Sequence, residues 1–72
     1  SEARTGLVRG EVRPMRARPA AGAPIAWRAE AGVVGKLRGC RDGWCDFDVK
    51  GRRGWIEAGQ LWGIEPGERV EE

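Results

Sequence analysis

Glycine and proline interrupt this chain so often that it cannot form a long helix. The 72 residues include twelve glycines and four prolines, and the glycines recur every few positions from Gly6 to Gly67. No stretch keeps the apolar period of about 3.6 residues that marks an amphipathic helix without meeting one of these breakers. Short apolar runs between frequent turns are typical of strands, and many short strands in a small chain predict a compact barrel or sandwich.

Six short runs have the composition expected of strands. They cover residues 6–10, 25–29, 33–40, 44–49, 53–56 and 63–65, with one turn of 3₁₀ helix expected over 57–62. The clearest alternation is in the fourth run, where Cys45, Phe47 and Val49 share one face and the residues between them share the other. Because Pro14 has no N–H to donate, we expect an edge or a bend there rather than a central strand.

The composition disfavours an enzyme. His, Tyr and Asn are absent and Ser, Thr and Gln occur once each, which removes most nucleophiles and general bases. Asp46 and Asp48 share a strand face about 7 Å apart, but nothing in the pattern buries them, so we interpret them as a solvated face. No nucleotide fingerprint or cluster of metal ligands is present. We therefore expect no catalytic residue, cofactor or metal, and no apolar stretch approaches the roughly 20 residues of a membrane span.

Charge is distributed unevenly along the chain. The net charge is +2, but residues 1–41 carry +6 and residues 42–72 carry −4, and eleven of the thirteen cations are Arg. We interpret this asymmetry as two halves that attract each other in the fold, with a basic binding face as the alternative. A small net charge and scattered cations also disfavour nucleic-acid binding.

The two cysteines flank a predicted hairpin turn. Cys40 and Cys45 enclose Arg41 to Trp44, and cross-strand partners in such a hairpin lie about 4.5–5.5 Å apart at their Cα atoms, within disulfide range. So small a loop limits the stabilisation to about 2–3 kcal/mol. Free buried thiols stay open as an alternative, and so does a metal shared with a second chain, because structural zinc takes four ligands. A disulfide would favour an oxidising compartment.

The four tryptophans give the chain a large aromatic surface for its size. We expect Trp55 to lie in the core or at its edge, and Trp44, opposite the face of Cys45, to be partly exposed. Exposed aromatic rings beside Arg can bind a peptide, a sugar face or a base. The weak candidates for ligand binding are Trp44, Trp27, Trp62, Arg16 and Arg18. The alternative for each ring is simply to fill space in a small barrel.

Three groups of residues follow one another in a characteristic order. The opening group is Val12, Met15-Arg16, Pro19 and Pro24-Ile25; the middle group is Gly32, Leu37, Asp42-Gly43-Trp44 and Phe47; the closing group is Gly51, Gly54-Trp55-Ile56 and Leu61. In this order and spacing the chain resembles the bacterial SH3 domain family over residues 10–64. It departs from the family at Pro14, where Asn is usual, and at Arg18, where a small residue is usual.

The resemblance implies an all-β fold, a small SH3-like, partly open β-barrel of five to six short strands with one 3₁₀ turn. We place this barrel over residues 9–65, after a flexible segment at 1–8 and before a charged tail at 66–72. The only methionine is Met15, so we expect Ser1 to follow a processing or engineering step.

The resemblance also implies a function. It predicts a non-catalytic binding or scaffolding module of the bacterial cell envelope, periplasmic or secreted, that recognises peptidoglycan or an envelope protein. Two alternatives stay open: a nucleic-acid-binding SH3-like barrel, and a purely structural or assembly domain, either monomeric or dimeric through strand exchange. A reader of proline-rich motifs is disfavoured, because the chain has no Tyr and its loop at 13–18 is basic.

Overall fold

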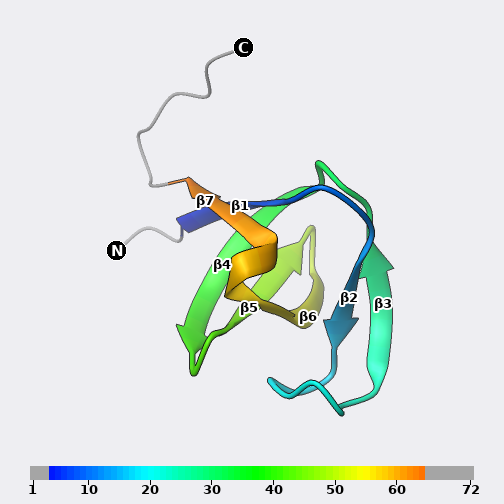
Figure 1. Cartoon of the computed structure of the whole chain (residues 1–72). Helices are drawn as coiled ribbons and strands as arrows, with labels where there is room; N and C mark the ends of the chain where they lie inside the picture. The colour runs from blue at the N-terminus through cyan, green and yellow to red at the C-terminus, as the bar shows by residue number, and fades with distance from the viewer. Residues whose placement is uncertain (1–3, 65–72) are drawn as a thin grey trace.

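Seven strands and one 3₁₀ turn make up the computed structural model, which describes residues 4–64 (Figure 1). The elements are β1 (Arg4–Val8), β2 (Arg13–Arg16), β3 (Ile25–Ala29), β4 (Val34–Arg41), β5 (Trp44–Val49), β6 (Arg52–Glu57), η1 (Ala58–Gln60) and β7 (Leu61–Ile64). The strands form one antiparallel sheet in the order β3-β2-β6-β5-β4-β1-β7. The sheet curls around its core while β3 and β7 remain edges, so the predicted all-β, partly open SH3-like barrel is confirmed.

The strand count exceeds the prediction by one, because β2 forms around Pro14. β2 pairs along its length with β3, where Pro14 lies opposite Arg28. On its other side it meets β6 only through Arg16 and Trp55. The missing N–H of Pro14 is therefore tolerated in a strand whose second side is almost unpaired.

The N-terminal segment is also a strand. Arg4–Val8 pairs with β4 on one side and β7 on the other, and Val8 is buried. Gly6 permits this close approach, because a Cβ there would lie 3.0 Å from Leu37 Cδ2 and 3.3 Å from Phe47 Cε1. The predicted flexible segment over residues 1–8 is therefore wrong for residues 4–8. Residues 1–3 and the predicted charged tail at 66–72 lie outside the described residues.

Two tight turns fix the register of the central strands. Asp42 and Gly43 connect β4 to β5 with φ values of 52° and 84°, and Lys50 and Gly51 connect β5 to β6 with φ values of 54° and 92°. Positive φ at both central positions is the signature of a type I′ turn, whose twist matches that of the two flanking strands. The first turn sets Cys40 opposite Cys45.

The core lies inside the curved sheet. Its largest fully buried side chains are Phe47, Met15, Ile56 and Val8, and the same cluster includes Ala29, Leu37, Cys45 and Leu61. In β6, Gly54 and Ile56 are buried and Trp55 between them is half-buried. Trp55 therefore points away from the core, so of its two expected positions, in the core or at its edge, the first is wrong.

Candidate functional site

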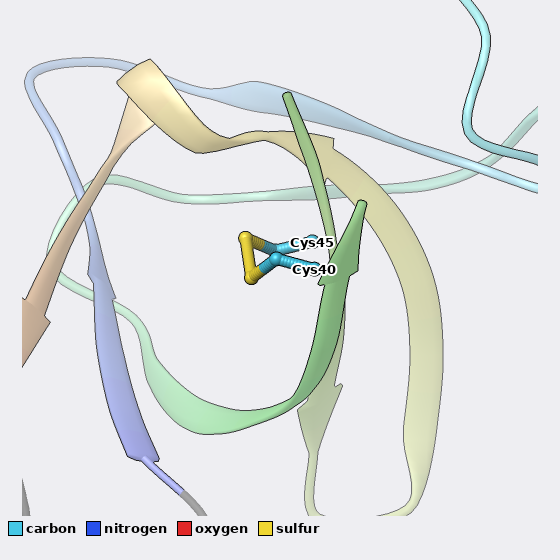
Figure 2. Close-up of a disulfide and its surroundings, with 2 residues drawn as sticks. All are labelled: Cys40 and Cys45. Carbon is cyan, nitrogen blue, oxygen red and sulfur yellow. A yellow bond between two sulfur atoms is a disulfide. The ribbon is translucent and has the colours of Figure 1, made fainter. Parts of the chain in front are cut away.

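The predicted disulfide is present at the end of the β4–β5 hairpin (Figure 2). Cys40 and Cys45 are direct cross-strand partners with Cα atoms 4.0 Å apart. Cys45 is buried in the core cluster and Cys40 is exposed. The bond therefore connects the rim of the barrel to its interior, immediately beside Trp44.

Four strands, β2, β4, β5 and β6, carry aromatic and charged side chains on the side of the sheet that faces away from the core. We call this the outer Trp–Arg surface, and its residues are Arg16, Arg41, Trp44, Asp46, Arg53 and Trp55. The register brings them together, because Trp55 of β6 lies opposite Asp46 of β5 on one side and opposite Arg16 of β2 on the other. A hollow of about 210 Å³ lies between these strands, lined by Arg16, Asp46, Arg53 and Trp55 among others.

Each guanidinium of this surface is held in place. Arg53 donates two hydrogen bonds to the carboxylate of Asp46, at 3.1 Å from Nε and 2.5 Å from Nη2, and this contact raises the pKa of Arg53 above its usual value. Arg16 donates to the carbonyl of Ala23 at 2.9 Å, and Arg41 stacks over the ring of Trp55 at 5.3 Å. Side chains fixed in this way lose little conformational freedom when a ligand binds.

The structure separates the five predicted ligand-binding residues. Arg16 and Trp44 belong to the outer Trp–Arg surface. Arg18 is exposed between β2 and β3 and does not line the hollow beside Arg16. Trp62 lies on edge strand β7, with 62% of its surface exposed and Arg9 over its ring at 5.6 Å. Trp62 thus belongs to a different part of the molecule from Trp44.

Trp27 has a packing role. Its indole Nε1 donates to the carbonyl of Arg53 at 3.0 Å, and the guanidinium of Arg52 lies 4.5 Å from its ring. The ring also packs against the core. Together these contacts hold edge strand β3 against β6. Ligand binding by Trp27 stays a prediction.

Trp55 is the aromatic residue of this surface that was missing from the predicted ligand-binding residues. The signal was available, because a Gly-Trp-Ile run in a strand puts its first and third residues on the same face. With Ile56 in the core, the period of two assigns Trp55 to the opposite face. The prediction of the core or its edge followed instead from the position of Trp55 beside Ile56.

Asp48 is buried, which corrects the interpretation that it belongs to a solvated face. It is 6% exposed and its carboxylate accepts from Arg38 Nε at 2.9 Å and from the N–H of Gly51 at 2.7 Å. These donors, Arg38 first, hold the pKa of Asp48 below its ordinary value of 3.8, although burial acts in the opposite direction. A carboxylate that stays ionised in this way cannot serve as a general acid.

We expect Asp48→Asn to destabilise the domain in a pH-dependent manner. A pKa that is lower in the folded state contributes stability above the unfolded value of 3.8, and the contribution disappears as the pH falls through the folded value. The difference in thermal midpoint between wild type and variant should have its full size at about pH 7 and decrease below about pH 4. Thermal unfolding followed by circular dichroism tests this, with exposed Glu30→Gln as the control. A difference that is constant with pH would contradict the assigned role.

The described residues contain neither a cluster of metal ligands nor a membrane-spanning helix. Within residues 4–64, no three side chains of His, Cys, Asp or Glu gather where they could hold a metal ion. That same part of the chain contains no helix with the length and apolarity needed to cross a bilayer.

Comparison with known protein families identifies a match. The model of a family described as bacterial SH3 domain matches residues 9–63. This range begins after β1 and contains every residue of the outer Trp–Arg surface. Searches of curated proteins and of solved structures found no match.

Proposed function

Because the chain belongs to the bacterial SH3 domain family, we propose that it is a binding module of the cell envelope, located in the periplasm or outside the cell. Members of this family are non-catalytic binding modules in general. We further propose that its ligand is peptidoglycan, and that the ligand contacts the outer Trp–Arg surface.

The observation that carries this proposal is the hollow beside Trp55. One wall is an indole ring, which can stack on the apolar face of a sugar. The other walls include Asp46 and the guanidinium groups of Arg16 and Arg53, whose remaining N–H groups can donate to peptide carbonyls or carboxylates. Aromatic rings and Arg are the residue types that contribute most to binding free energy at protein surfaces.

The disulfide supports a location outside the cytoplasm. Disulfides persist in oxidising compartments and are rare where glutathione and thioredoxin keep thiols reduced. Cys40 is exposed, so one of the two bonded residues lies at the surface of the domain. A stable bond between Cys40 and Cys45 is therefore compatible with the periplasm or the cell exterior.

Co-sedimentation with isolated peptidoglycan sacculi tests the proposal. We expect the purified 72-residue chain to be retained on sacculi at both low and physiological salt. Trp44→Ala and Trp55→Ala should each reduce retention by about fivefold or more, since an aromatic contact in a binding site contributes about 1 kcal/mol or more. The matched control is Trp62→Ala, which removes an exposed ring from β7.

Three results would contradict the proposal. Retention that disappears at physiological salt, with equal capture on DNA, would indicate nonspecific polyanion binding. Retention lost in Trp62→Ala but kept in Trp44→Ala and Trp55→Ala would place the ligand on another surface. No retention of the wild type would direct the search to envelope proteins or to a structural role.

A further inference from the structure

A second hollow, separate from the outer Trp–Arg surface, lies beside the start of β4 and the turn between β5 and β6. β4 pairs with β5 from Lys36 onward, so Val34 and Gly35 precede that pairing. The hollow has a volume of about 480 Å³, and the residues that bear on its chemistry are Thr5, Val34, Lys36, Arg38, Asp48 and Lys50.

The hollow carries an excess of positive charge. Arg38 and Asp48 neutralise each other, with Arg38 Nη2 2.8 Å from Asp48 Oδ2 and Nε at 2.9 Å. Lys36 and Lys50 are exposed, and neither ammonium group takes part in a hydrogen bond or ion pair with any described residue. Two ammonium groups are therefore available to an anionic ligand.

An apolar row leads to this hollow across three neighbouring strands. Leu7 of β1 lies opposite Trp62 of β7 on one side and opposite Val34 of β4 on the other. Trp62 is 62% exposed and Val34 is 52% exposed, and Val34 also lines the hollow. Exposed apolar side chains on adjacent strands, ending beside two cations, form a surface suited to a ligand that is apolar along its length and anionic at one end.

We propose that this surface binds the C-terminal end of a short apolar peptide, with its terminal carboxylate between Lys36 and Lys50 and its side chains on the row of Val34, Leu7 and Trp62. The row spans two strand spacings, about 10 Å, which corresponds to about three residues of extended peptide. A carboxylate at the end of an apolar peptide matches both the two ammonium groups and the exposed apolar row beside them, whereas free phosphate would contact the ammonium groups alone.

Titration of the ¹⁵N-labelled chain with two tetrapeptides tests this assignment. Both have the sequence acetyl-Leu-Ala-Leu-Ala; one ends in a free carboxylate and the other in an amide. We expect the free acid to shift the amide signals of Thr5, Val34 and Gly51 and to bind about tenfold more tightly than the amide form, since it gains two charge contacts. Signals of Trp44 and Trp55 should stay in place.

Substitution of the two lysines separates charge from packing. The double variant Lys36→Gln/Lys50→Gln should bind the free acid about tenfold more weakly while its affinity for the amide form is unchanged. The charge-conserving variant Lys36→Arg/Lys50→Arg should retain binding. Both positions are exposed, so we expect both variants to fold.

Four outcomes would overturn the proposal. Equal affinity for the acid and amide forms would show that the terminal carboxylate does not contribute to binding. At ~20 mM free acid, even a ligand with a millimolar Kd saturates its site. Absence of binding at that concentration would show that the surface does not bind an apolar peptide. Stronger shifts with inorganic phosphate would indicate a general anion site, and binding to phosphatidylglycerol vesicles but to neither peptide would indicate a lipid surface. None of these outcomes depends on retention by sacculi.

Discussion

Replacing Gly54 by alanine is expected to destabilise the domain by about 2–3 kcal/mol and to lower its thermal midpoint by about 10–20 °C. A Cβ at this position would lie 2.6 Å from Met15 Cβ and 3.4 Å from the carbonyl carbon of Met15. Neither atom is the end of a flexible side chain, so β2 would have to move away from β6. These two strands pair only through Arg16 and Trp55, so a small displacement would separate them.

The matched control for this prediction is Gly39→Ala. Gly39 also lies in a strand, and an added Cβ there would meet nothing within 4 Å. Thermal unfolding of the two variants followed by circular dichroism should therefore give a large loss for Gly54→Ala and a change of less than about 1 kcal/mol for Gly39→Ala. Similar midpoints for the two variants would show that β2 and β6 tolerate separation, and that the close contact at Met15 is not a determinant of stability.

The sequence predicted correctly those elements whose bounds depend only on their own residues and on the turns beside them. β3 and β5 begin and end at the predicted positions, because apolar alternation and the flanking turns define both. The disulfide followed from the same local argument, since a two-residue turn at Asp42-Gly43 makes Cys40 and Cys45 partners. The features that local patterns missed depend on strands distant in sequence.

β1 and Asp48 are examples of this second kind. β1 is a strand because it lies between β4 and β7, and the residues of β1 alone do not indicate that these two strands pair with it. Asp48 is buried because Arg38 reaches it from β4, where the register shifts between Leu37 and Gly39. A regular alternation cannot anticipate that shift, so the sequence alone predicted a solvated carboxylate.

The candidate sites divide for the same reason. The sequence placed both Trp44 and Trp62 among the candidates for ligand binding, without showing whether they share a surface. The sheet order places β5 and β6 on one side of β4, and β1 and β7 on the other. Trp44 therefore joins Trp55 and Arg16, whereas Trp62 joins Leu7 and Val34, and the two groups call for different variants and different ligands.

Removal of the disulfide is the second large effect that we expect. The double variant Cys40→Ser/Cys45→Ala should lose about 2 kcal/mol and about 10 °C in thermal midpoint, because the bond closes a small loop in the unfolded chain. Alanine is chosen at position 45 because Cys45 is 4% exposed in the core cluster. A serine hydroxyl there would be buried without a hydrogen-bond partner.

We expect the fold to survive this loss, because the remaining seven residues of the core cluster do not depend on the bond. Two-dimensional ¹H–¹⁵N spectra of the variant should retain dispersed signals at 25 °C, and reduction of the wild type should shift its midpoint in the same direction. An oxidised wild type and a double variant with equal midpoints would contradict a stabilising disulfide. Loss of dispersion at 25 °C would show instead that the core cannot hold the barrel without it, since a domain this small has only a few kcal/mol of stability to lose.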